Sequence, residues 1–70
     1  MNAAEKLSRE VERVTTIKAH FEELRSMPNV IVEPQIIIMQ ASLERAHKAA
    51  GSNDPLQVMQ AIGDLEGYSE

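Results

Sequence analysis

The sequence predicts an all-α domain of three helices: a long first helix, a second helix of medium length and a short third helix. Apolar residues recur at helical spacing along three stretches, and prolines and a glycine fall between those stretches. The composition, 43% hydrophobic and 26% charged, is that of an ordinary globular protein. Because 70 residues suffice for one core only, we expect a single helical domain over residues 1–70.

The first helix is expected over about residues 2–26. Asn2 followed by Glu5 resembles a capping box, and Pro28 marks the end of the helix. The apolar residues form a seam of the kind that packs lengthwise on another helix, although Glu10 interrupts it. The seam residues, expected in the core or in a dimer interface, are Leu7, Val11, Val14, Ile17, Phe21 and Leu24.

A connector bracketed by Pro28 and Pro34 comes next, and we expect it to be an extended, apolar linker and not a regular strand. The second helix is expected over residues 35–50, since Pro34 suits a first turn and Gly51 suits the position just after a helix. Its core face is expected to hold Ile36, Met39, Leu43, Ala46 and Ala50.

The third helix, expected over residues 54–66, has the clearest start signal in the chain. Asp54 is placed as the N-cap, with Pro55 in the first turn and Gln57 three residues after the cap. Gly63 weakens this helix by about 1 kcal/mol relative to alanine. One side of the helix is expected to carry Val58, Met59, Ile62 and Leu65.

A core of this size is small, because a chain of this length buries only about 60% of its unfolded surface. The chain has one Phe, one Tyr and no Trp to fill that core. Pairing of two copies, with the long first helices packed on each other or on the second helices, would add buried surface. We therefore expect a helical homodimer.

The charge distribution excludes several classes of partner. Residues 1–48 hold seven basic and seven acidic side chains, whereas residues 49–70 hold four acidic side chains and no Lys or Arg, which gives the net charge of −4. Nucleic-acid binders need a basic patch, so no direct binding to nucleic acid is expected.

No feature of the sequence predicts contact with a membrane. The longest apolar run, residues 36–39, is too short to span a membrane, and the N-terminus has no secretory signal. We therefore expect a cytoplasmic protein that does not bind membranes.

An aliphatic cluster surrounds the junction of the first two helices. Successive helical residues point about 100° apart, so no single face can bury the three consecutive isoleucines 36–38. One interpretation is that the linker and a dimer partner cover the cluster. The other is a docking surface for another protein, and its candidate residues are Val30, Ile31, Ile37 and Ile38.

A polar lane on the first helix, formed by Arg9, Arg13, Thr16 and His20, is the second candidate for binding a partner. Guanidinium groups are well suited to paired hydrogen bonds at an interface. The alternative is an ordinary solvated face, partly neutralised by nearby glutamates.

No enzyme activity and no cofactor are expected. The chain has no Cys, two His and no Gly-rich loop, so motifs for nucleophilic catalysis and for phosphate binding are absent. Glu44 and His47 have the spacing of two metal ligands on one helix face, which leaves a metal-binding helical bundle as an alternative. A simple polar pair at the edge of that face is the other interpretation.

The short acidic chain, its Leu7/Val14/Phe21 seam, the Pro-bracketed linker and the second helix ending at Gly51 resemble the small early proteins of temperate bacteriophages that inhibit host regulators, in particular the phage anti-activator of quorum sensing. This resemblance implies a helical homodimer that binds a transcription activator responsive to acyl-homoserine lactones and blocks its DNA binding. It also implies a second host partner, the pilus-assembly ATPase. A small structural or adaptor dimer without inhibitory action remains the alternative.

Overall fold

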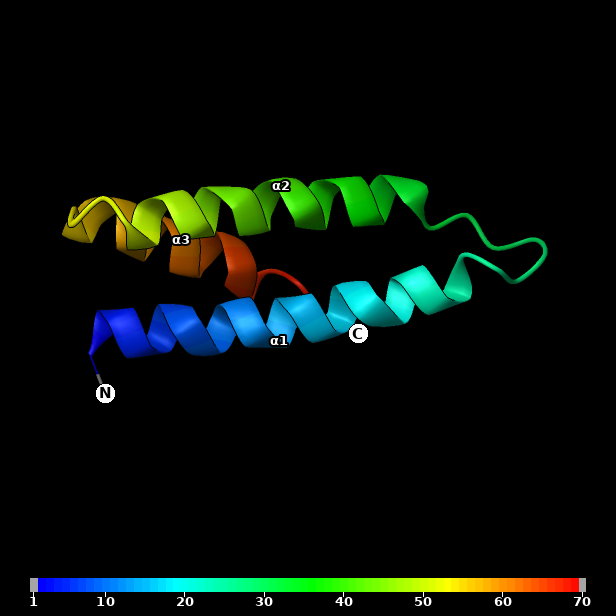
Figure 1. The fold of residues 1–70 in the computed structure, drawn as a ribbon, viewed down its shortest axis with the longest axis horizontal. Helices are drawn as coiled ribbons and strands as arrows, with labels where there is room; N and C mark the ends of the chain where they lie inside the picture. Colours follow the sequence, from blue (N-terminus) through cyan, green and yellow to red (C-terminus); the bar gives the residue numbers. More distant parts are fainter. Residues whose placement is uncertain (1, 70) are drawn as a thin grey trace.

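The computed structural model describes residues 2–69 and confirms the all-α fold. Helix α1 spans Ala3–Leu24, α2 spans Glu33–Ala50 and α3 spans Pro55–Glu66. Helices α1 and α2 form a long antiparallel hairpin, and α3 lies against both of them at one end of that hairpin (Figure 1). The molecule measures 43 × 19 × 16 Å.

Helix α1 begins as its sequence predicts. The side chain of Asn2 accepts a hydrogen bond of 2.8 Å from the backbone N–H of Glu5, which satisfies one of the free donors of the first turn. Within the seam, Leu7, Val14 and Ile17 are buried, and Val11 and Phe21 are half-buried against the core. Most of the seam thus packs against the other two helices of the same chain, and the homodimer stays a prediction.

The linker and the start of α2 differ from expectation in two respects. Residues 30 and 31 have no regular structure, but Val32 is the N-cap of α2 and has right-handed backbone angles. Helix α2 starts at Glu33, two residues earlier than expected, because a proline within the first turn removes only an N–H that has no partner there. An ion pair of 2.5 Å between Arg25 and Glu33 joins the two ends of the linker.

The core face of α2 contains Ile36, Met39, Leu43 and Ala46, as predicted, but its last buried residue is Ala49 and not Ala50. Gly51 is the C-cap residue with right-handed angles, whereas Asn53 takes the left-handed conformation. Asparagine tolerates that conformation, so the chain reverses direction two residues later than the glycine suggested.

Helix α3 begins at Pro55 with Asp54 as its N-cap, and the carboxylate accepts a bond of 3.0 Å from the N–H of Leu56. Ala61, Ile62 and Leu65 are buried, whereas Met59 is 61% exposed, so the expectation that Met59 shares one side with Ile62 and Leu65 is wrong. The physical reason is that successive helix residues point about 100° apart. Val58 packs against the core, so the next residue, Met59, points away from it.

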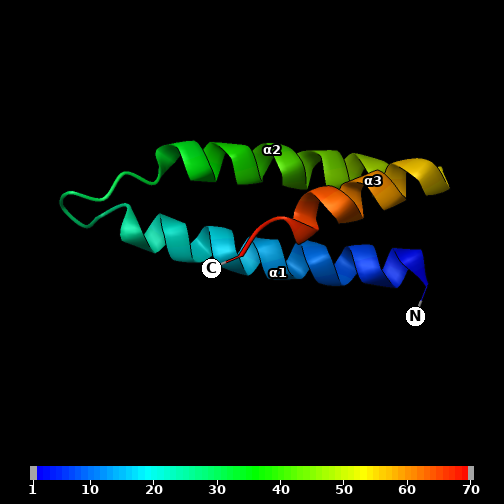
Figure 2. The same ribbon diagram turned by 180° about the vertical axis from the view of Figure 1, so that it is seen from behind.

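The three helices do not cover one another along their whole length. Helix α1 is about 33 Å long and α3 only about 18 Å at the usual rise per residue. Figures 1 and 2 show that α3 ends near the middle of α1, so the half of the hairpin next to the linker is only two helices thick. For this reason Leu24, expected in the core or a dimer interface, is 37% exposed at that end.

Candidate interaction surfaces and the clamp on the C-terminal segment

The two-helix end of the hairpin carries a concentration of exposed aliphatic side chains. We call this set the hairpin-tip patch: Leu24, Met27, Val30, Ile31, Ile37 and Ile38. Most exposed are Ile31 at 86% and Ile37 at 65%. Single exposed apolar residues are common on proteins, but several gathered at one end of a molecule are typical of a binding surface or of an interface between copies.

The isoleucine triplet is divided as its helical spacing predicts. Ile36 is buried at 7% exposure, whereas Ile37 and Ile38 are 65% and 50% exposed. In the linker Val32 is buried, which fixes the chain against the hairpin, while Val30 and Ile31 remain exposed. All four residues proposed from the sequence as an aliphatic docking surface therefore lie at one end of the molecule and face solvent.

The polar lane of α1 divides into two parts. Arg9, Thr16 and His20 are exposed, and the hydroxyl of Thr16 donates to the backbone carbonyl of Glu12 at 3.0 Å. Arg13 is only partly exposed, because its guanidinium donates hydrogen bonds to backbone carbonyls of the same chain. Arg13 thus has a structural role within the chain, and its place in a partner-binding surface stays a prediction.

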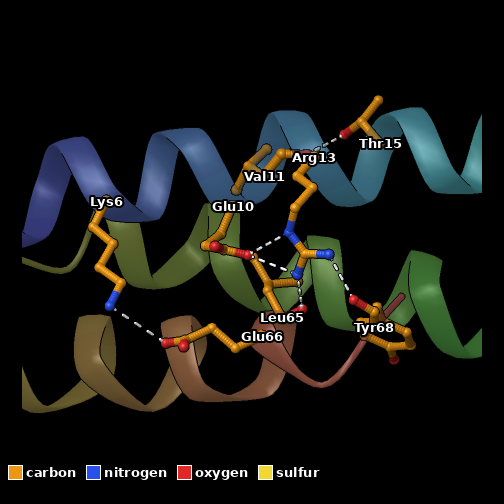
Figure 3. Close-up of polar contacts among 8 residues, drawn as sticks. All are labelled: Lys6, Glu10, Val11, Arg13, Thr15, Leu65, Glu66 and Tyr68. Atoms are coloured by element: carbon orange, nitrogen blue, oxygen red, sulfur yellow. Dashed lines mark hydrogen bonds and ion pairs between the residues drawn. The ribbon is translucent and has the colours of Figure 1, made fainter. Parts of the chain in front are cut away.

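Arg13 clamps the end of α3 to α1 (Figure 3). One terminal nitrogen donates to the carbonyl of Tyr68 at 2.6 Å and the other to the carbonyl of Leu65 at 2.7 Å. The guanidinium also pairs with Glu10, whose carboxylate lies 2.8 Å from it. Glu10, which interrupts the apolar seam in the sequence, thus supplies the counter-charge of the clamp. A cation at the C-terminal carbonyls of a helix is also favoured by the helix dipole.

A second polar cluster holds the same segment from α2. The hydroxyls of Ser42 and Tyr68 lie 2.7 Å apart, and the Tyr68 hydroxyl donates to the carbonyl of Ile38 at 3.3 Å. Arg45 donates to Ser42 at 3.0 Å and to the Asp64 carboxylate at 2.9 Å. Ser42 is fully buried, and its partners satisfy the polar atom that burial would otherwise leave without a hydrogen bond.

Sequence reasoning missed this cluster. Its one visible signal is a serine on the core face of α2, between Met39 and Leu43, because a buried hydroxyl requires a partner. The partner, Tyr68, is 26 residues away along the chain. Only the packing of the helices brings the two together.

Glu44 and His47, the candidate pair of metal ligands, are not joined by a third candidate ligand among residues 2–69. Both residues are exposed on α2, and the Glu44 carboxylate accepts a hydrogen bond of 3.2 Å from the side chain of Gln40. Within residues 2–69, no group of three or more His, Asp or Glu side chains is placed to share a metal ion. The metal-binding alternative therefore has no support from the geometry of this part of the chain.

The most apolar hollow lies between the N-terminal half of α1 and the C-terminal half of α2. Its volume is about 250 Å³, and it is lined mainly by small or aliphatic side chains, including Ala4, Val11, Ala46 and Val58. Pockets that hold cofactors or small-molecule ligands usually measure about 300–1,000 Å³. The hollow is thus at the lower limit for such a ligand.

Among the residues that the structure describes, no helix is long and apolar enough to cross a lipid bilayer. Comparisons with protein-family models, with curated proteins and with solved structures find no match to this chain.

Proposed function

We propose that this protein acts without catalysis, by docking its hairpin-tip patch on another protein. The observation that carries the proposal is the exposure of this patch on the half of the hairpin that α3 does not cover. A groove or surface of complementary shape on a partner would remove these side chains from water, and each fully buried aliphatic side chain contributes about 1.5–3 kcal/mol.

The fold itself does not require the exposed residues of the patch to be aliphatic. The core beneath them is completed by buried side chains such as Ile17, Val32 and Ile36. Ile31 and Ile37 extend into solvent, where a polar residue would serve stability equally and solubility better. A requirement other than folding therefore favours apolar residues here, and partner binding supplies one.

The partner that we propose is the DNA-binding region of a transcription activator, in line with the resemblance to phage anti-activators of quorum sensing. Such a region is basic, and this chain carries a net charge of −4, which would steer the two proteins together. Occupation of that region would block its binding to DNA in the cytoplasm of the host. The pilus-assembly ATPase implied by the same resemblance is proposed as a second partner.

A competition experiment tests this function directly. The purified DNA-binding region of an activator responsive to acyl-homoserine lactones is bound to fluorescent operator DNA, and the protein is added while anisotropy is recorded. The wild type should displace the DNA. Ile37→Asp places a charge in the patch and should weaken displacement by about tenfold or more, because a buried unpaired charge is costly.

Ser8→Asp is the matched control, since Ser8 and Ile37 are both exposed helix residues, the change in charge is the same, and Ser8 lies in the first two turns of α1, far along that helix from the hairpin-tip patch. It should displace the DNA nearly as well as the wild type. If the wild type binds the activator but leaves the DNA in place, the adaptor alternative is favoured. If it does not bind, or if both variants lose activity equally, the proposed function is refuted.

A further inference from the structure

The outer face of α3 is the second exposed apolar surface of the molecule. We use the term α3 outer face for Leu56, Met59, Gln60, Gly63 and Gly67, all of which are exposed. Leu56 is 65% and Met59 61% exposed, and none of the five residues is charged. A helix surface that faces only water normally carries charged and polar side chains. Depletion of charge and the presence of Met are instead typical of the centre of a protein interface.

The contacts of α3 within the chain do not explain why position 63 is a glycine. It lies inside α3 at a right-handed backbone position, where glycine lowers helix stability relative to alanine. A Cβ atom built at this position meets no other atom within 4 Å, so no neighbouring segment of the chain requires the missing side chain. The close approach of a backbone from a second molecule would require glycine at this position.

The order of large and small residues makes the α3 outer face complementary to itself. Leu56 and Met59 lie before position 61 of the chain, and Gly63 and Gly67 lie at nearly matching separations after it. If a second copy packs antiparallel, Met59 of each chain lies against Gly63 of the other, and Leu56 lies against Gly67. We propose that two copies of this protein associate through the α3 outer face, antiparallel, with the two-fold axis crossing that face between Gln60 and Gly63.

The charges beside this face permit the pairing. On one flank Asp64 pairs with Arg45 at 2.9 Å, and on the other flank Glu66 pairs with Lys6 at 3.7 Å. A two-fold axis perpendicular to both helices brings each flank against the same flank of the second copy. Since each flank holds an ion pair of one acidic and one basic group, the two flanks that meet are each neutral and no like-charge contact is forced.

The size of the face sets the strength of this association. Helix α3 is about 18 Å long, so alone it offers less than the roughly 800 Å² per partner of a stable interface. The groove beside it, between α2 and α3, is lined by residues that include Lys48, Gln57 and Gln60 and widens the surface available to a second copy. We therefore expect a dimer that forms reversibly between micromolar and millimolar concentrations.

Disulfide trapping tests the position of the axis. The natural sequence has no cysteine, so a single introduced thiol reports on one position only. Gln60→Cys places the thiol beside the proposed axis, where the two Cα atoms must come within about 7 Å for a disulfide to form. Ile37→Cys is the matched control in the hairpin-tip patch. Under equal oxidation, the Gln60→Cys chain should form a covalent dimer much faster than the Ile37→Cys chain.

Sedimentation equilibrium of the cysteine-free protein measures the association itself. The wild type should show a monomer–dimer equilibrium. Gly63→Gln fills the site of close approach and should raise the dimer dissociation constant by about tenfold or more, while the thermal midpoint of a dilute sample does not fall. A charge in the patch, Ile37→Asp, should leave the dimer unchanged.

Three results would overturn the inference: a monomer at all concentrations, faster trapping at position 37 than at position 60, or an unchanged dissociation constant in Gly63→Gln. None of them bears on the DNA competition experiment, because that experiment tests the hairpin-tip patch with a different partner. The two proposals can therefore fail separately.

Discussion

Replacement of Arg13 by alanine should destabilise the protein strongly, although its sequence position in a polar lane of α1 also favours a place on a binding surface. The guanidinium holds the carbonyls of Leu65 and Tyr68, 52 and 55 residues further along the chain, and pairs with Glu10. Without it, the last turn of α3 and the segment that follows lose their attachment to α1.

The magnitude follows from these contacts. A hydrogen bond from a charged donor contributes about 1.5–3 kcal/mol, but the Arg13 side chain is 38% exposed, so we take about 1 kcal/mol for each of the two carbonyls. A cation at the C-terminus of α3 adds about 0.5 kcal/mol. The Glu10 carboxylate, 18% exposed, also loses its counter-charge. A total loss of about 2–3 kcal/mol is expected, from a stability of roughly 4–10 kcal/mol for a chain of this length.

Urea unfolding followed by circular dichroism at one fixed protein concentration measures this loss. With a slope of about 1 kcal/mol per molar urea, the midpoint of Arg13→Ala should fall by about 2–3 M. Arg13→Lys keeps the charge but lacks the planar guanidinium that donates to two carbonyls at once. Its midpoint should therefore lie between those of the wild type and Arg13→Ala. Arg9→Ala, an exposed position on the same helix, is the control. Ordinary surface substitutions change the unfolding free energy by about 0.5 kcal/mol or less. If the unfolding free energies of Arg13→Ala and Arg9→Ala differ by less than about this amount, the clamp does not stabilise the fold.

Two further substitutions are measured in the same assay. Tyr68→Phe keeps the ring but removes the hydroxyl that contacts Ser42 and the Ile38 carbonyl, and it should lower the unfolding free energy by about 0.5–1.5 kcal/mol; an unchanged midpoint would show that water replaces these bonds. Gly63→Ala should raise the unfolding free energy by about 0.5–1 kcal/mol, because the helical position is right-handed and the added methyl group meets no atom within 4 Å; a loss of stability would mean that the local backbone needs glycine.

The parts of the fold that could be predicted are those encoded by neighbouring residues. Asn2 and Asp54 cap their helices through side-chain bonds to residues two or three positions away, and both starts were predicted correctly. The seam of α1 and the core face of α2 follow from spacing alone, as does the division of the isoleucine triplet. These signals are local, so they do not depend on how the helices pack.

The features that the sequence did not predict depend on packing between distant segments. Arg13 gives no sign in the sequence that it will meet carbonyls more than 50 residues away, and an arginine in a polar lane is equally compatible with solvent. The spacing of the apolar residues predicts that Met59 shares one side of α3 with Val58, Ile62 and Leu65, whereas the buried side is completed by Ala61. The exposure of Leu24 depends on where α3 ends, which the pattern of α1 does not encode.

The length of α3 connects the two surfaces on which the proposals depend. Because α3 has only 12 residues, it covers one half of the hairpin and leaves the other half as two helices with the hairpin-tip patch exposed. The same helix faces solvent on its other side with Leu56 and Met59. The patch and the α3 outer face therefore lie on different elements and share no residue. A dimer formed through α3 would leave a patch free on each copy, so one dimer could engage two partner chains, and a symmetric partner would be bound more tightly than a single patch allows.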